Sequence, residues 1–141
     1  MSVVELGPAD APAAIALWEA TALTRPWNPP RADFDRAISD SASAVLGIRD
    51  GDALVATAMV GHDGHRGWLY YLAVAPDQQR RGLGAALVRA AEAWIVARGG
   101  VKLQLMVRGE NDAVAAFYRA LGYDEQPVVV HGRRLEASGG S

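Results

Sequence analysis

The chain has 141 residues, of which 50% are hydrophobic and 21% are charged, with a formal net charge of −2. These values are typical of a folded domain and exclude a disordered chain, and the slight negative charge argues against nucleic acid as the main partner, because phosphate binding needs a basic face. There is no cysteine, so disulfides, thiolate metal sites and a cysteine nucleophile are excluded.

Membrane and export signals are not expected from the sequence. No apolar run approaches ~18 residues, the length that a membrane span needs. The first twenty residues lack a basic leader followed by an apolar core, so no signal peptide is predicted. A cytoplasmic location is therefore favoured.

The first quarter of the chain is predicted to hold a short strand and two helices. The strand spans residues 3–6, and the first helix opens at Pro8-Ala9-Asp10 with Asp10 as N-cap and continues to Glu19. Prolines end this helix in an irregular loop, TALTRPWNPP, at residues 21–30. A second helix is expected over residues 32–39.

Two Asp-Gly pairs predict a meander of three antiparallel strands. Asp50-Gly51 joins a strand at residues 44–49 to one at 53–60. Asp63-Gly64 joins the latter to a strand at residues 67–74. Asp-Gly between apolar runs is a typical hairpin turn.

A glycine-rich turn and a clear helical pattern follow. Apolar residues recur at helical spacing after the turn, and Gly99-Gly100 ends the helix. These apolar residues are Leu83, Leu87, Ala90, Ala91, Trp94 and Ile95.

The last third of the chain is predicted to contain a strand, a helix and a closing hairpin. The strand spans residues 101–107, and Asn111 caps a helix over residues 112–121. The hairpin would join residues 128–130 to Arg134-Leu135. The domain is then expected to end at residue 136, with a disordered tail at 137–141.

The turn Gln79-Arg80-Arg81-Gly82-Leu83-Gly84 indicates a phosphate site. The first N–H groups of a helix lack intrahelical partners and the helix dipole favours an anion there. The nucleotide loop GxxxxGK[ST] is absent, and Leu87 occupies the place of the third glycine in G-x-G-x-x-G. An ordinary glycine-rich helix entry with solvated arginines is the alternative.

The same six residues resemble the Q/R-x-x-G-x-G/A pattern of the GNAT superfamily of N-acetyltransferases, whose loop holds the pyrophosphate of coenzyme A. The segment YLAVAP at residues 71–76 resembles the central strand of that superfamily, and NDAVAAFYRALGY at 111–123 resembles its second cofactor element. LTRPWN, GHDGHRG and LGYDE are similar to the YpeA-like bacterial acetyltransferases.

This resemblance implies a single α/β (α+β) domain with a central mixed, mostly antiparallel sheet flanked by helices. It implies acetyl transfer from acetyl-CoA to an amine, either a small amine or a protein N-terminus or lysine. Direct attack in a ternary complex is the expected mechanism, because a cysteinyl acyl-enzyme is impossible. No metal is expected, and the chain would act as a monomer or homodimer. The alternatives are a non-catalytic acyl-CoA-binding module and an unrelated α/β domain that binds another phosphorylated ligand.

The resemblance also assigns the cofactor site. The backbone of the central strand would bind pantetheine and the oxyanion, the turn would bind the pyrophosphate, and the second element would complete the site. The residues implied are Leu72, Ala73, Val74, Gln79, Arg80, Arg81, Gly82, Leu83, Gly84, Ala85, Asn111, Phe117 and Tyr118.

Tyr118 matches the tyrosine that protonates the departing thiolate in many family members. A phenol with a pKa near ~10 can supply a proton to a thiolate whose conjugate acid has a pKa near ~8.5. The alternative is that Tyr118 only packs beside Phe117. For Asn111, a helix N-cap is an alternative that is compatible with cofactor contact.

The general base is less clear, because residues 67–74 contain no acid. His62 and His65 are the first candidates, with Asp63 and Glu19 behind them. If Asp63-Gly64 is a two-residue turn, the histidines face each other across the hairpin. The alternatives are an exposed hairpin tip and a metal site of both histidines and Asp63.

The acceptor amine is expected near the proline-rich loop, where the family usually shapes that site. Arg25, Trp27 and Asn28 are the candidates there, although Trp27 can instead anchor the loop on the core. Tyr70 and Tyr71 alternate on the strand, so one should face the acceptor and the other the core.

Overall fold

The computed structural model describes residues 1–135, and these fall into two compact units. The first unit comprises Met1–Met106 and the second begins at Val107. The end of the predicted domain at residue 136 and the predicted tail at 137–141 lie outside the described residues. Each unit is described by itself below.

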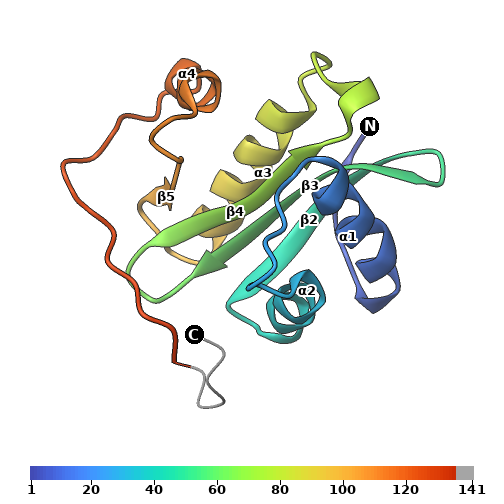
Figure 1. Ribbon diagram of the computed structural model, residues 1–141, viewed down its shortest axis with the longest axis horizontal. Helices are drawn as coiled ribbons and strands as arrows, with labels where there is room; N and C mark the ends of the chain where they lie inside the picture. Colours follow the sequence, from blue (N-terminus) through green and yellow to red (C-terminus); the bar gives the residue numbers. More distant parts are fainter. Residues whose placement is uncertain (136–141) are drawn as a thin grey trace. The chain divides into compact units, whose positions relative to one another are not determined.

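The first unit is built on a five-stranded sheet in the order β1-β2-β3-β4-β5 (Figure 1). Strands β1 to β4 pair antiparallel with their sequence neighbours, and β5 lies parallel to β4. The strands span Val3–Glu5, Ser43–Asp50, Ala53–His62, Gly67–Val74 and Leu103–Leu105. The sheet is therefore mixed and mostly antiparallel, which confirms the predicted class.

Helices cover both faces of this sheet. Helices α1 (Ala11–Ala20) and α2 (Pro30–Ser39) lie on one face and α3 (Leu83–Ala97) on the other, as Figure 1 shows. Short 3-10 helices, η1 (Pro8–Asp10) and η2 (Pro76–Gln78), precede α1 and α3. No helix within residues 1–135 is long and apolar enough to cross a membrane.

The core on the α1/α2 face is centred on Trp18 and Phe34, which are both fully buried and 6.1 Å apart between ring centroids. Val45 of β2 and Ala73 of β4 contribute from the sheet. On the opposite face, Ile95 of α3 packs closely on the sheet, and a Cβ at Gly67, the first residue of β4, would lie 2.5 Å from Ile95 Cδ1. The alternation of strand side chains thus supplies two separate apolar layers.

Asp10 is the N-cap residue of α1 as predicted, although its side chain makes no capping hydrogen bond to that helix. The carboxylate accepts a hydrogen bond from the Gly7 N–H at 2.9 Å and pairs with Arg49 of β2. Asp10 therefore closes the η1 turn and ties it to the sheet.

Both hairpins form, with turns that differ from the expected ones. Asp50 pairs with Ala53, so the first turn consists of Gly51 and Asp52, and Gly51 has a φ of 63°. In the second hairpin His62 pairs with Gly67, which leaves a four-residue connection in place of a two-residue turn. The Asp63 carboxylate stabilises this longer connection, because it accepts hydrogen bonds from the N–H groups of His65 and Arg66.

The second unit contains α4 (Asp112–Ala120). The Asn111 side chain caps it as predicted, accepting a hydrogen bond from the Val114 N–H at 3.2 Å, and Gly122 ends it with a φ of 98°. The predicted hairpin of residues 128–130 and 134–135 is wrong, since the described residues after α4 form no strand. The three valines at 128–130 are 66–82% exposed, so they lack the neighbouring strand that a β-branched run needs.

The strand expected over residues 101–107 is also shorter than predicted. Only Leu103–Leu105 pairs with β4, and Val101 is exposed. β5 is an edge strand of the sheet, and it pairs with β4 over these three residues only.

Candidate functional site

The glycine-rich turn connects η2 to α3 and leaves the start of that helix open. Gly82 is the N-cap residue with a φ of 77°, and Arg80 has a φ of 68°. No side chain among the described residues caps α3, and its first turn contains no acid. The first N–H groups of a 15-residue helix are therefore available to an anion, with the positive end of the helix dipole behind them.

The two arginines of the turn differ in availability. Arg81 pairs with Asp50 at 3.6 Å and with the Gln78 side chain. Arg80 is exposed and makes no hydrogen bond or ion pair with any described residue. Gln79 donates a hydrogen bond to the Val74 carbonyl at 3.4 Å. The turn is thus tied to the end of β4 while the Arg80 guanidinium stays open.

Strand β4 contains a β-bulge at Tyr71 and Leu72. Thr57 of β3 pairs with Ala73 and Met59 pairs with Tyr70, so two residues of β4 face the single residue Ala58. A bulge leaves one residue without a ladder partner and bends the strand. The backbone of residues 72–74, which the family resemblance assigned to pantetheine and the oxyanion, therefore begins at a bulge residue, Leu72, that periodicity did not reveal.

The bulge also decides which tyrosine faces the core. Tyr71 packs against the α1/α2 core, where its ring stacks on Trp18 with centroids 3.9 Å apart. Tyr70 is 42% exposed. Burial, with a smaller effect from the charge of Asp63, raises the pKa of Tyr70, so its phenol stays neutral. Tyr70 is thus the more exposed of the two tyrosines.

The polar side chains of the proline-rich loop make different contacts. The Arg25 guanidinium donates to the carbonyls of Ala22 and Thr24, both at 2.9 Å, so this side chain is used within its own loop. The Asn28 amide donates to Asp33 at 2.9 Å and to the Tyr71 hydroxyl at 3.2 Å. The loop is therefore joined to the bulge through Asn28, whereas Arg25 stabilises its fold.

Trp27, in the same loop, is 58% exposed. Trp27 is therefore not one of the buried core residues. Trp27 and Tyr70 present aromatic surface to solvent, and Asn28 lies next to Trp27 in the chain.

The predicted face-to-face arrangement of His62 and His65 is wrong, because His62 pairs with Gly67. The Nδ1 atom of His62 accepts a hydrogen bond from the Gly64 N–H at 3.2 Å, and its Nε2 atom is buried without a partner among the described residues. His65 is exposed at the tip of the connection. Residues 1–135 contain no group of three His, Cys, Asp or Glu that could hold a metal, so the alternative metal site is not formed.

Asp63 organises this hairpin connection. The N–H groups of Arg66 and His65 donate to its carboxylate and hold the pKa of Asp63 below its ordinary value. His65 lies in the connection before Gly67, and Gly67 is four strand positions, or about 13 Å, from Tyr71. The structure therefore does not bring the hairpin histidines to the bulge.

In the second unit, Tyr118 is buried and lies edge-on to two rings. The centroids of Phe117 and Tyr123 are 5.0 and 5.9 Å from that of Tyr118. Burial raises the pKa of Tyr118 to about 12. The phenol therefore keeps its proton at neutral pH and can donate a hydrogen bond to an anion.

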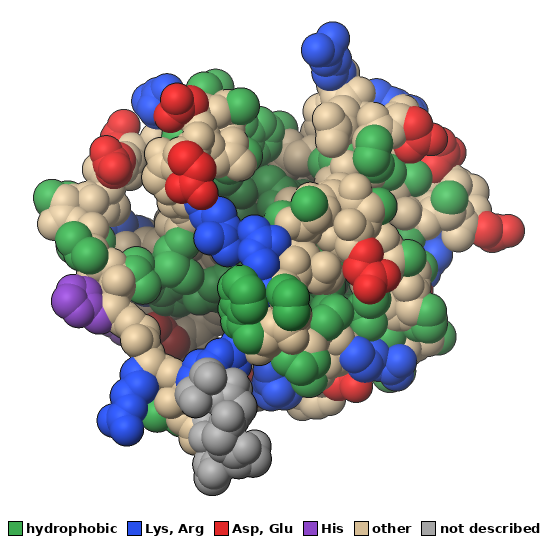
Figure 2. Space-filling model, in the orientation of Figure 1, with side chains coloured by type: hydrophobic (Ala, Val, Ile, Leu, Met, Phe, Trp, Pro, Cys, Tyr) green, Lys and Arg blue, Asp and Glu red, His purple; other side chains and the backbone are tan. Residues whose placement is uncertain are grey.

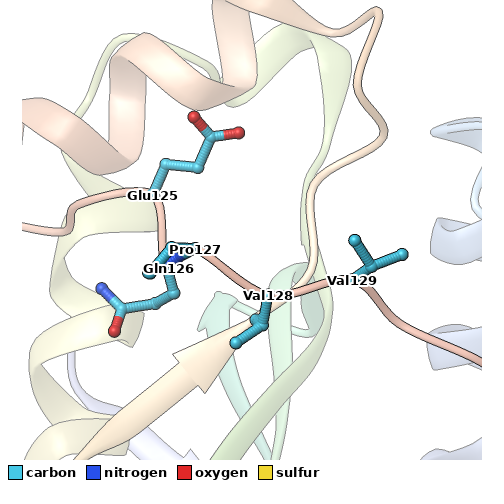
Figure 3. Close-up of a pocket in the computed structure, with 5 residues that line it drawn as sticks. All are labelled: Glu125, Gln126, Pro127, Val128 and Val129. Carbon is cyan, nitrogen blue, oxygen red and sulfur yellow. The ribbon is translucent and has the colours of Figure 1, made fainter.

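A depression in the second unit is lined by residues 125–129 (Figure 3). The side chains of Glu125 and Gln126 point away from each other, as do those of Val128 and Val129. Polar groups in a ligand site converge on one point, and these do not, so this depression is not a candidate site.

Charged side chains of both signs are interspersed with hydrophobic ones over the face drawn in Figure 2.

Three residues of the network around Tyr71 were not predicted from the sequence: Trp18, Asp33 and Thr57. The one available signal was Thr57, a polar residue in the middle of the apolar run ALVATAMV. The contacts that join these residues span 38 and 39 positions in the chain, a range that no local pattern reveals.

Comparisons with known proteins agree with this geometry. The model of the acetyltransferase (GNAT) family matches residues 13–123, a range that includes parts of both units. An acetyltransferase of Yersinia enterocolitica is 43% identical over 121 residues, which is 86% of each chain.

Two solved structures are similar in fold. The ribosomal-protein-S18-alanine N-acetyltransferase from Escherichia coli has a TM-score of 0.76 at 26% identity and covers 89% of this chain and 78% of its own. The aminoglycoside N-acetyltransferase AAC(6')-Iy in complex with CoA has a TM-score of 0.80 at 17% identity and covers 94% of this chain and 93% of its own.

Proposed function

Because the chain belongs to the GNAT acetyltransferase family, we propose that it transfers an acetyl group from acetyl-CoA to an amine. The observation that carries the proposal is the open start of α3, where Gly82 has a φ of 77° and Arg80 has no partner among the described residues. Helix N–H groups, backbone freedom and an unpaired guanidinium suit a pyrophosphate. Arg81 and the turn residues up to Ala85 complete this proposed contact.

The bulge in β4 is the proposed site of the thioester. Its irregular backbone, around Leu72, offers groups outside the sheet ladder to the pantetheine and to the carbonyl oxygen. Preorganised N–H donors stabilise the oxyanion that develops when an amine attacks. Direct attack in a ternary complex is the proposed route, since the chain has no cysteine to form an acyl-enzyme.

Tyr118 is the proposed donor to the departing sulfur. With a pKa of about 12, the phenol is a weaker acid than a thiol, whose pKa is ~8.5. It therefore stabilises the thiolate as a hydrogen-bond donor, and water completes protonation. Asn111 and Phe117 remain proposed cofactor contacts on α4.

The acceptor is proposed to lie beside Trp27, Asn28 and Tyr70. Two structural neighbours are named for different acceptors, an aminoglycoside in one and an alanine of ribosomal protein S18 in the other. Both acceptor classes, small amines and protein N-termini, therefore stay within the proposal, as does lysine.

Calorimetric titration with acetyl-CoA tests the proposal. The wild-type protein should bind, and Arg80→Ala should weaken binding because it removes the open cation of the turn. Arg89→Ala is the matched control, since Arg89 lies on the exposed side of the same helix and pairs with Glu92. A folded wild type that binds a nucleotide but not acetyl-CoA would refute the proposal. Binding without transfer to any amine in a screen of both classes would instead support an acyl-CoA-binding module.

A further inference from the structure

A buried threonine stands in the middle of the apolar strand β3. Thr57 is fully buried and is the one polar residue among the buried side chains of residues 1–135. Its hydroxyl accepts a hydrogen bond from Trp18 Nε1 at 2.9 Å and donates one to the Tyr71 carbonyl at 3.1 Å. The Thr57 O–H group is therefore hydrogen-bonded to the backbone of the β4 bulge.

Tyr71, the bulge residue, is held from three sides. Its carbonyl accepts from Thr57, its ring stacks on Trp18 at an interplanar angle of 13°, and its hydroxyl donates to Asp33 Oδ2 at 2.7 Å. Its φ is 51°, a conformation that residues other than glycine rarely adopt. Strained backbone of this kind persists only where the surroundings hold it in place, and it is concentrated at functional sites.

The same contacts reach the proline-rich loop. The Asn28 amide donates to Asp33 Oδ2 and to the Tyr71 hydroxyl. Trp27, the preceding residue, is exposed. The proposed acceptor loop and the bulge are thus joined by one set of hydrogen bonds.

Asp33 is used as an acceptor on both oxygens. Oδ2 accepts from Tyr71 and Asn28, and Oδ1 accepts from Arg36 at 2.5 Å. Its side chain is 16% exposed. A carboxylate with these three donors orients the side chains that donate to it.

We propose that Thr57 and Asp33 are positioning residues for acetyl transfer. They hold Tyr71 in its strained conformation, which keeps the bulge open for the thioester end of acetyl-CoA and fixes the acceptor loop against it. Without them Tyr71 would relax toward ordinary strand geometry, and the pairing of β4 with β3 would close over the bulge. This inference rests on the proposed function.

A test must separate this role from a purely structural one. Acetyl-CoA and adenosine 3′-phosphate 5′-diphosphate share the nucleotide, but only the first carries the pantetheine and thioester. The turn before α3 would bind both ligands, whereas the bulge would bind only acetyl-CoA. Thr57→Val, which keeps the side-chain shape and removes the hydroxyl, should therefore weaken acetyl-CoA binding by about tenfold and leave the nucleotide within about twofold.

Two further variants sharpen the experiment. Thr57→Ser restores the hydroxyl and should recover acetyl-CoA binding. Thr21→Val is the matched control, because the Thr21 hydroxyl donates to the carbonyls of Leu17 and Trp18 at the end of α1 and does not contact the bulge. Its acetyl-CoA affinity should equal that of the wild type. If Thr57→Val does not fold, Tyr71→Phe, which keeps the stacked ring and loses the bond to Asp33, should show the same selective loss.

The outcomes are distinct. A selective loss that Thr57→Ser rescues supports the inference. Equal loss of both ligands, or no loss of either, refutes it and leaves the proposed function standing. A wild type that binds neither ligand refutes the proposed function, and the inference falls with it.

Discussion

Replacing Gly82 by alanine tests whether the turn before α3 must keep its left-handed backbone to bind acetyl-CoA. Gly82 has a φ of 77°, and a Cβ added there would meet no heavy atom within 4 Å. The cost of the change is therefore conformational and not steric. For an L-residue the left-handed region costs roughly 1–2 kcal/mol.

The open position of Gly82 indicates where that cost appears. Because nothing packs on it, the turn can relax in the free protein at little loss of stability, and the ligand must then restore the strained form. A cost of about 1–2 kcal/mol corresponds to a loss of affinity of roughly 5- to 30-fold. The melting temperature should change little.

Gly99→Ala provides the matched control. Gly99 follows the other end of α3 with a φ of 80°, and a Cβ there also meets nothing within 4 Å. The Gly99 and Gly100 N–H groups donate to the carbonyls of Val96 and Ile95, both at 3.0 Å, so this helix end cannot relax without losing hydrogen bonds. The cost of Gly99→Ala should therefore appear in the free energy of unfolding, with acetyl-CoA affinity unchanged. Calorimetric titration and urea unfolding of the three proteins measure both quantities. If Gly82→Ala binds acetyl-CoA as tightly as the wild type, the turn does not hold the pyrophosphate in this conformation.

Three further predictions concern Tyr118 and the core. Tyr118→Phe should lower turnover by about 10²-fold with acetyl-CoA affinity within twofold, as steady-state kinetics and titration would measure; equal turnover would remove Tyr118 from the mechanism. Because burial raises the pKa of Tyr118 to about 12, above the ~10 of an unfolded tyrosine, its contribution to stability is complete below pH ~10 and is lost as the pH rises toward 12, and the phenylalanine variant should lack that loss. Gly67→Ala should cost about 1–3 kcal/mol of unfolding free energy, because its Cβ would lie 2.5 Å from Ile95 Cδ1. Ile95→Val removes the Cδ1 atom and, added to Gly67→Ala, should recover part of this cost. If the cost is unchanged, strain elsewhere in β4 is responsible.

Elements with a local cause were predictable from the sequence. The spacing of apolar residues in α3 and the glycine after it placed that helix within a residue or two of its observed bounds. Asn111 was predicted as an N-cap and is one. Both Asp-Gly pairs mark hairpins, although the turns begin one residue later or extend to four residues. Such details depend on side-chain hydrogen bonds that the pair alone does not specify.

The bulge at Tyr71 was not predictable in the same way. A residue in this conformation is stabilised by Trp18, Thr57 and Asp33, which lie on three different elements. Family resemblance pointed to this strand, and the residues of the strand itself contain no glycine or other local mark of a bulge after Gly67. The bulge depends on tertiary contacts, so the alternation of residues along the strand could not predict it.

The closing hairpin failed for the opposite reason. Three consecutive valines favour a strand intrinsically, but a strand also needs a neighbour to satisfy its backbone. In the second unit the segment at residues 128–130 has none and is exposed. The valines do favour a strand, but the prediction assumed a neighbouring strand that the second unit does not provide.

The positions of the side chains that could accept a proton also bear on how the substrate amine loses its proton. Asp33 already accepts hydrogen bonds from Tyr71, Asn28 and Arg36, and His62 accepts at Nδ1 from Gly64 while its Nε2 is buried. His65 lies in the connection before Gly67, which is itself about 13 Å along the strand from the bulge, and would act only through several waters. If solvent takes the proton, the amine must arrive neutral, and the rate will rise with pH to a plateau set by the pKa of the acceptor itself. Two acceptors of different basicity would then give profiles displaced by the difference in their pKa values. A rising limb at the same pH for both acceptors, abolished by His65→Gln, would instead establish that histidine as the base.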